Sequence, residues 1–514
     1  MTGPSAGTPS ATGPLAPVNC DLLVTGARVI DPETGLDAVR TVAVSGGTIV
    51  SVTAAGEPVP RAERTIDATG LVLTPGFIDL HSHAQSITGH RLQALDGVTT
   101  ALDLEAGALP VAASYAAAAE QGRPLNFGFS AAWASARMQV LDDVTLEPNA
   151  QGALATFAAH QAGPRWRGPA GANEVSRILG QLGDAVAEGA IGIGVLVGYA
   201  PESARSEYVA VSRLAERLRV PTFTHARYLS NEAPKSSLEG ALEVIAAAAG
   251  TGAHMHLCHV NSTSNRMIDQ VADAIERARG DGVRVSTEAY PYGAGSTVIG
   301  AAFLAPELLA RSGLRPDSIT YLPTGERIAD AARLRELRED DPGGLAVVHF
   351  FDEADEGDLA ILERSLLMPD TAIATDAMPA VDRRGRLAGD DWPLSPELVA
   401  HPRSAGSYAR TFRWLVRERG VLSLVEAVRR CTLLPARILE DAVPQFRRKG
   451  RVQVGCDADL VVFDADRIGD RATYDNLAPS VGVRHVLVGG TAVVRDGELL
   501  PEALPGRPIR SGDA

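Results

Sequence analysis

Residues 75–83 read PGFIDLHSH, an apolar run that ends in two histidines one residue apart. The run fits a buried strand, and a strand followed by a helix then repeats along the chain. VPTFTHA (220–226) precedes the helical stretch LEGALEVIAAAA (238–249), and AHMHLCHVNS (253–262) precedes RMIDQVADAIERAR (266–279). Alternation of this kind indicates βαβ units and a parallel sheet. We therefore expect an α/β protein with a (β/α)8 TIM barrel, and a doubly wound sheet is the second possibility.

Short strands with glycine-rich turns lie at both ends of this repeat. LLVTGARVI (22–30) and TVAVSGGTIVSV (41–52) come before it, and RVQVGCDADLVVFD (451–464) and VRHVLVGGTAVVRDGE (483–498) come after it. We expect the two ends to form one small β-sandwich. The predicted domains are a disordered leader at 1–18, the first part of the sandwich at 19–70, the barrel at 71–440 with a helical insertion at about 300–345, and the second part of the sandwich at 441–512.

The composition excludes several classes of partner. The 514 residues carry a net charge of −15 and only 5% aromatic residues, which argues against a nucleic-acid-binding surface. No run of 18 apolar residues predicts a membrane span, and residues 1–18 lack the features of a secretory signal. The four cysteines form no CxxC motif, which favours a cytoplasmic protein over a disulfide framework. We expect a small-molecule substrate and allow for a homo-oligomer.

Several predicted strands end in residue types that bind metals. His81 and His83 are two residues apart, so both side chains point to one face of their strand. His225 ends VPTFTHA, His259 follows the strand HLC, and Asp376 ends the run TAIATD. In a barrel the carboxyl ends of the strands meet at one face, where active sites lie. These nitrogen and oxygen donors suit zinc or a similar divalent ion.

The motifs PGFIDLHSH, GVTT, THAR, CHVNS, AYPYGAGS, TDA and HPR, in this order, resemble the amidohydrolase superfamily. Within it, the chain is most similar to the N-acyl-D-amino-acid deacylase (D-aminoacylase) family, and the resemblance covers nearly the whole chain. The resemblance implies a hydrolase of carbon–nitrogen amide bonds with one or two zinc ions. It assigns one metal to His81, His83 and Asp376, and the other to His225 and His259.

The residue that bridges two such metals is a lysine in many members of the superfamily. That lysine is carboxylated and lies on the fourth strand. This chain contains only Lys235 and Lys449, and the strand AIGIGVLVG (190–198) contains no lysine. Neither lysine ends a suitable strand, so we expect no carboxylated-lysine bridge.

The D-aminoacylase family instead uses a cysteine in a G-N-C-G segment after GVTT. This chain reads GVTTALDLEAG there, with Ala106 at the position of the cysteine. We predict that Glu105 is the bridging carboxylate, with Asp103 on the same face of the strand as the alternative. His254 and His256 alternate with His259 along their strand, and Cys258 is adjacent to His259, so we expect all three to face away from the site.

The inferred reaction is hydrolysis of an amide bond by metal-bound hydroxide. Zinc lowers the pKa of a bound water to about 7 and polarises a carbonyl group. Asp376 is the candidate general base, which would carry the proton from the water to the leaving nitrogen. By the resemblance, Tyr199, Tyr290 and Ser296 match positions that contact the substrate.

An N-acyl amino acid also carries a free carboxylate, and arginine is its natural bidentate partner. Arg227, two residues after His225, and Arg403 in HPR are the candidates. The family often has a lysine two residues after the histidine that matches His259, but here that residue is the neutral Asn261.

The residues also allow two alternative functions. A cyclic-amide hydrolase of the hydantoinase or dihydroorotase type would use the same metal ligands, but such enzymes generally depend on the bridging lysine. A non-catalytic barrel that serves as a binding protein would have lost metal ligands, whereas all five histidine and aspartate ligands are present.

Overall fold

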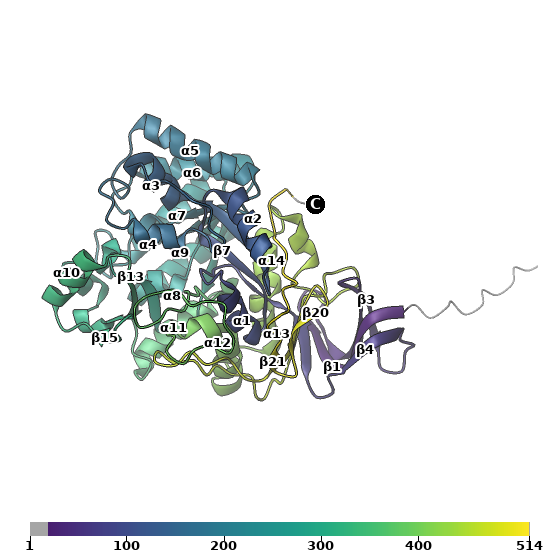
Figure 1. The fold of residues 1–514 in the computed structure, drawn as a ribbon. Coiled ribbons are helices and arrows are strands. Elements are labelled where there is room, and N and C mark those ends of the chain that lie inside the picture. Colours follow the sequence, from purple (N-terminus) through teal and green to yellow (C-terminus); the bar gives the residue numbers. More distant parts are fainter. Residues whose placement is uncertain (1–18, 513–514) are drawn as a thin grey trace, which may run out of the picture.

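A computed structural model of the chain describes residues 19–512 (Figure 1). The leader predicted for residues 1–18 lies outside the described residues. A barrel of parallel strands occupies the centre, and helices surround it. The strands from both chain ends lie together at one side of the barrel, and a smaller sheet lies near α10.

Eight parallel strands form the barrel, in the spatial order β17-β12-β11-β10-β9-β8-β7-β6. The strands are short and buried: β6 (Phe77–Asp79), β7 (Val98–Ala108), β8 (Asn126–Ala132), β9 (Ile193–Val195), β10 (Thr222–Thr224), β11 (Met255–Leu257), β12 (Val285–Ala289) and β17 (Thr371–Ile373). The first and last strands meet through a bridge between Ser82 and Ala377, where the amide of His83 donates to the Ala377 carbonyl at 2.8 Å. The expected barrel is therefore present and nearly closed.

Helices cover the outside of the barrel and connect its strands. Those that follow the strands up to β12 are α1 (Ile87–Leu95), α2 (Val111–Gln121), α3 (Trp133–Asp142), α4 (Leu154–Ala159), α5 (Ala172–Ala187), α6 (Arg205–Leu218), α7 (Ser237–Thr251), α8 (Val260–Ser264) and α9 (Ile268–Gly280). Those nearer the carboxyl terminus are α10 (Ala331–Asp340), α11 (Glu356–Leu367), α12 (Arg403–Arg410), α13 (Leu424–Cys431) and α14 (Leu433–Leu439).

Helix α7 shows how the sequence sets these boundaries. Its N-terminus carries a reciprocal cap, in which the amide of Ser236 donates to the Glu239 carboxylate at 2.7 Å and the amide of Glu239 donates to the Ser236 hydroxyl at 3.3 Å. The helix ends at Gly252, whose φ of +78° suits a residue without a side chain. Val244 and Ala248, one turn apart, are both buried against the barrel.

The second sheet combines the two ends of the chain into the predicted sandwich. Its order is β21-β20-β19-β18-β5-β1-β2-β3, and β4 also pairs with β1. Residues 19–25 of β1 pair with β4 and residues 28–29 pair with β5, so the sheet turns a corner near Gly26. The strands are β1 (Asn19–Asp31), β2 (Leu36–Ser45), β3 (Thr48–Ala54), β4 (Arg61–Asp67), β5 (Val72–Pro75), β18 (Leu460–Phe463), β19 (Val483–Val488), β20 (Thr491–Arg495) and β21 (Glu498–Leu499).

The region predicted as a helical insertion, about residues 300–345, contains the α-helix α10 and three short 3-10 helices, and it also contributes strands to a small antiparallel sheet. The order of this sheet is β13-β16-β14-β15, and α10 has ten residues. Pro306 and Gly313 interrupt the apolar pattern that suggested further helix. The strands are β13 (Ala294–Val298), β14 (Ile319–Tyr321), β15 (Glu326–Arg327) and β16 (Leu345–His349). This sheet brings β13 over the carboxyl end of the barrel.

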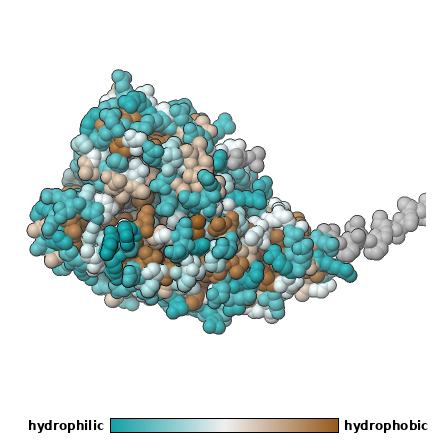
Figure 2. Space-filling view, in the orientation of Figure 1, coloured by the Kyte–Doolittle hydropathy of each residue, from teal (hydrophilic) through white to brown (hydrophobic). Residues whose placement is uncertain are grey.

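The two lysines lie in different environments. Lys449 is buried, and its ammonium group lies 2.6 Å from Asp459 and 3.0 Å from Asp457. Lys235 is exposed and lies 3.2 Å from Glu202. The face shown in Figure 2 is mostly hydrophilic, with apolar residues in small separate groups. Among the described residues, no helix combines the length and the apolar character that crossing a membrane requires.

Candidate metal centre

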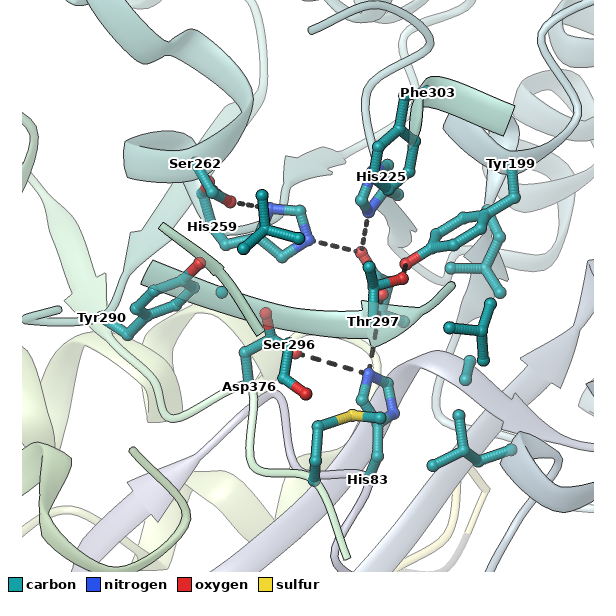
Figure 3. Close-up of a pocket in the computed structure, with 18 of the residues that line it drawn as sticks. His83, Tyr199, His225, His259, Ser262, Tyr290, Ser296, Thr297, Phe303 and Asp376 are labelled. Carbon is teal, nitrogen blue, oxygen red and sulfur yellow. Dashed lines mark hydrogen bonds and ion pairs between the residues drawn. The ribbon is translucent and has the colours of Figure 1, made fainter. Parts of the chain in front are cut away.

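Six candidate ligands gather at the carboxyl end of the barrel, although they come from distant parts of the sequence. Figure 3 shows His83, His225, His259 and Asp376. They are His81 and His83 after β6, Glu105 in β7, His225 after β10, His259 after β11 and Asp376 after β17. Each is at most 8% exposed. The shared position follows from parallel strands that all end at one face.

Four donor atoms form the first group. His81 Nε2 lies 3.1 Å from His83 Nε2, 3.3 Å from Glu105 Oε2 and 3.5 Å from Asp376 Oδ1. His83 Nε2 lies 3.7 Å from the same two carboxylate atoms. A tetrahedral zinc ion with bonds of about 2.0–2.1 Å separates its ligand atoms by about 3.3–3.4 Å. The spacing of this group therefore fits a zinc ion.

The second group shares one carboxylate with the first. Glu105 Oε1 lies 3.1 Å from His225 Nδ1 and 2.9 Å from His259 Nε2. Its other oxygen faces His81 and His83, so the two oxygens of Glu105 point toward different pairs of histidines. The arrangement can hold one metal ion or two.

Asp103, the alternative bridging carboxylate, makes different contacts. Its Oδ1 accepts hydrogen bonds from the amides of Ala106 at 3.2 Å and Gly107 at 3.1 Å. The same atom lies 3.1 Å from His83 Nδ1, on the side of the ring away from the other donors. Asp103 therefore orients His83, and the structure corrects the expectation that it could bridge the site.

Sequence analysis missed Glu288, which contacts His81 at Nδ1, the ring nitrogen that does not face the other donors. Glu288 Oε1 lies 2.5 Å from His81 Nδ1, and Glu288 Oε2 lies 3.1 Å from His256 Nε2. A carboxylate in this place fixes the tautomer of His81 and directs Nε2 at the centre. The one signal in the sequence was an acidic residue inside the strand VSTEA, which is otherwise uncharged.

Cys258 and His256 do not face away as expected. Possible ligand atoms of Cys258, His81 and Glu288 lie within 4.8 Å of one another. The alternation fails because His259 has a φ of +30°, which turns the chain at the end of β11. Cys258 therefore lies behind His81 rather than outside the barrel.

The packing of imidazoles against carboxylates shifts several pKa values. Burial would raise the pKa of Glu105, but His81, His259 and His225 hold it well below its usual value. Burial would lower the pKa of His83, but Asp103 raises it to about 9. Glu105 is therefore ionised, which is the form that a metal ligand requires.

Four of the predicted substrate residues line one cavity with the ligands, namely Tyr199, Tyr290, Ser296 and Arg403. Arg403 Nη2 lies 2.8 Å from Asp376 Oδ1 and donates to the Ser296 carbonyl at 3.1 Å. The guanidinium carbon lies 4.6 Å from the centre of the Tyr290 ring. Arg403 is fully buried, yet its Nε and Nη1 have no hydrogen-bond partner. These two nitrogens, with three N–H groups between them, therefore lack partners among the described residues.

Arg227 does not line this cavity, and the structure corrects its predicted role. Its guanidinium forms a paired contact with Glu243 at 2.7 and 2.9 Å. It also donates to the carbonyls of Pro201 at 2.9 Å and Ser203 at 2.8 Å. A buried arginine with these partners supports the loop after β9 and points away from the cavity residues.

Comparisons with known proteins agree with this geometry. A model described as "Amidohydrolase family" matches residues 64–494. The chain is 30% identical to N-acyl-D-glutamate deacylase of Alcaligenes xylosoxydans xylosoxydans, covering 95% of this chain and 96% of the relative. It is 26% identical to N-acyl-D-aspartate deacylase of the same organism, covering 97% of each chain.

A solved structure shares the whole fold. The crystal structure of N-acyl-D-glutamate deacylase from Bordetella bronchiseptica has a TM-score of 0.75 and 25% sequence identity, and the match covers 96% of this chain and 100% of that chain. That crystal contains zinc and a phosphonate inhibitor that mimics the tetrahedral intermediate of the reaction.

Proposed function

The chain belongs to the amidohydrolase family, and from this membership we propose that it is a zinc-dependent hydrolase of N-acyl-D-amino acids. The observation that carries the proposal is one cavity lined by members of both groups of metal donors, joined by Glu105, and by a buried arginine whose Nε and Nη1 have no hydrogen-bond partner. The relatives that span nearly the whole chain are deacylases of this kind.

The proposed zinc ligands are His81, His83 and Asp376 in the first group, His225 and His259 in the second, and Glu105 between them. When bound, zinc polarises the amide carbonyl and lowers the pKa of a water molecule to about 7. Glu288 and Asp103 hold His81 and His83 in the orientation that directs each Nε2 at the donors opposite.

Asp376 is the proposed general base. Its Oδ1 lies 3.5 Å from His81 Nε2, and Arg403 Nη2 lies 2.8 Å from the same oxygen. From this position Asp376 takes a proton from the attacking water and delivers it to the leaving nitrogen.

Arg403 is the proposed partner of the substrate carboxylate, through its free Nε and Nη1. Among the described residues that line the cavity, it is the only arginine or lysine. A D-glutamate or D-aspartate substrate would bring a second carboxylate that finds no cation, at a cost of several kcal/mol. Much of the remaining lining is apolar, including Phe303, Phe350 and Met378. We therefore propose that the amino acid released has an apolar side chain.

The test is a substrate screen with zinc-loaded protein before and after chelation. N-acetyl-D-leucine and N-acetyl-D-methionine should be hydrolysed, N-acetyl-D-glutamate at least about 100-fold more slowly, and a chelator should abolish all turnover. Turnover of hydantoins alone would instead establish the cyclic-amide alternative. Zinc binding without turnover of any amide would instead support the alternative that the barrel is a non-catalytic binding protein.

We also propose a cytoplasmic location, which is supported by four buried cysteines with free thiols. The expected homo-oligomer stays a prediction that light scattering of the purified protein would test.

A further inference from the structure

A second cavity adjoins the metal centre. It has a volume of about 310 Å³, at the lower end of the ~300–1,000 Å³ that small-molecule sites usually have. It shares His83 and Leu154 with the cavity that contains the metal donors. None of the proposed contacts for the amino-acid part, Tyr199, Tyr290, Ser296 and Arg403, lines this second cavity.

The two cavities therefore extend from the metal centre toward different groups of residues. In Figure 3, Tyr290 and His83 lie on opposite sides of Asp376. Arg403 and Tyr290 line only the first cavity, whereas His83 lines both. An N-acyl amino acid has two arms that diverge from the scissile carbonyl. If Arg403 binds the carboxylate arm, the other arm leaves on the side of His83.

The walls of the second cavity are mostly apolar. α4 contributes Leu154, Ala155 and Ala158, and the segment after β17 contributes Pro379, Val381 and Leu387. Leu387 is 48% exposed although it is a large apolar residue, and a bridge with Val381 holds it in place. An apolar ligand in the cavity would cover this side chain.

Apart from His83, which both cavities share, the charged groups of the second cavity are few and differ from those of the first. Asp341 accepts a hydrogen bond from the Tyr321 hydroxyl at 2.5 Å, and Arg384 is exposed. Neither resembles Arg403, whose buried Nε and Nη1 have no hydrogen-bond partner. The second cavity thus suits an uncharged apolar chain better than a carboxylate.

We propose that this cavity is an acyl subsite for linear apolar acyl chains of medium length, such as hexanoyl and octanoyl groups. The inference rests on the proposed deacylase function and extends it to the part of the substrate that its relatives' names leave open. Each methylene that is fully buried contributes about 0.8 kcal/mol, which corresponds to roughly a fourfold increase in kcat/KM.

The test is a chain-length series on one amino acid, from N-acetyl-D-leucine through N-butanoyl and N-hexanoyl to N-octanoyl-D-leucine, with zinc-loaded protein. We expect kcat/KM to rise at least about tenfold from acetyl to octanoyl, since partial burial reduces the fourfold gain per methylene. A flat or falling series, with N-acetyl-D-leucine still hydrolysed, would overturn the acyl subsite and leave the deacylase function standing. No hydrolysis of any member would overturn both.

Three variants test whether the dependence of kcat/KM on acyl-chain length arises in this cavity. Ala155→Phe fills the cavity from α4, and Leu387→Asp places a charge in its wall from the other segment, so each should reduce the octanoyl-to-acetyl ratio of kcat/KM to near one. Ala159→Phe is the matched control, because Ala159 is exposed on the same helix and does not line the cavity. The control should keep the wild-type ratio. A ratio that stays high in both Ala155→Phe and Leu387→Asp would show that the acyl chain binds elsewhere.

Discussion

The two oxygens of Glu105 face different pairs of histidines, so replacing Glu105 tests whether it bridges the two groups of metal donors. In Glu105→Gln the amide cannot supply two anionic oxygens, so we expect a loss of zinc per chain and at least about a 100-fold loss of kcat/KM. Zinc content by elemental analysis and turnover of N-acetyl-D-leucine measure this. Asp103→Asn should keep the zinc stoichiometry with a smaller loss, and full zinc content and activity in Glu105→Gln would remove Glu105 as the bridge.

Arg403 can be tested by the charge of the substrate. In Arg403→Lys the planar pair of N–H donors is lost, so KM for N-acetyl-D-leucine should rise at least about tenfold. The corresponding amide, N-acetyl-D-leucinamide, lacks the carboxylate and should lose less. Equal losses on both substrates would mean that Arg403 acts through Asp376 alone.

At the scale of elements, the buried pair of Arg137 in α3 and Glu207 in α6 joins two helices outside the barrel. Arg137 Nη1 lies 2.6 Å from Glu207 Oε1, Trp133 donates to the same oxygen at 3.0 Å, and both members of the pair are fully buried. Arg137→Met would leave a buried unpaired carboxylate, which costs about 3–5 kcal/mol of the free energy of unfolding.

Unfolding in urea measures this cost. The double variant Arg137→Met with Glu207→Gln removes the unpaired charge and should recover part of the stability. An Arg137→Met protein with the wild-type unfolding midpoint would contradict a role of this pair in joining α3 to α6.

Element patterns also explain which parts of the site could be predicted. The histidines at strand ends follow from the two-residue period of a strand and from the shared edge of parallel strands, so His81 and His83 were accessible from sequence. The alternation fails where the backbone leaves strand geometry. His259 has a positive φ, so the predicted orientation of Cys258 was wrong. β7 changes register between Asp103 and Ala108, so alternation alone could not decide between Glu105 and Asp103.

Long-range partners were not accessible from sequence. The contact of Glu288 with His81 spans 207 residues, and no local pattern encodes it. Arg227 lies in a site motif, but its pairing with Glu243 depends on how α7 packs after β10. The antiparallel sheet of the insertion depends on pairing between β13 and β16, whose residues lie some fifty positions apart.

At the scale of the whole molecule, Glu33 holds the two ends of the chain together. It lies in the turn after β1 and pairs with Arg451 at 2.8 Å through both oxygens, and Gln453 donates to it at 2.9 Å. The hydrogen bonds from Arg451 outweigh burial and lower the pKa of Glu33 to about 2. A lowered pKa stabilises the folded state above the ordinary value near 4.5, and this stability is lost as the pH falls toward 2.

Comparison with Glu33→Gln isolates this effect from the other titrating groups. The melting temperature of the native protein should exceed that of Glu33→Gln at pH 7, and the difference should shrink as the pH falls from about 4.5 to 2. Differential scanning calorimetry across this range measures both proteins. A difference that does not change with pH would mean that the charge of Glu33 contributes nothing.

The two lysines have a practical consequence for attaching the protein to surfaces and labels. The ammonium group of Lys449 is buried between Asp457 and Asp459, whereas Lys235 is exposed and does not line the cavity of the metal centre. Among lysine side chains, amine-reactive reagents should therefore modify one position. Coupling to a support or a dye at Lys235 would keep the active site unmodified.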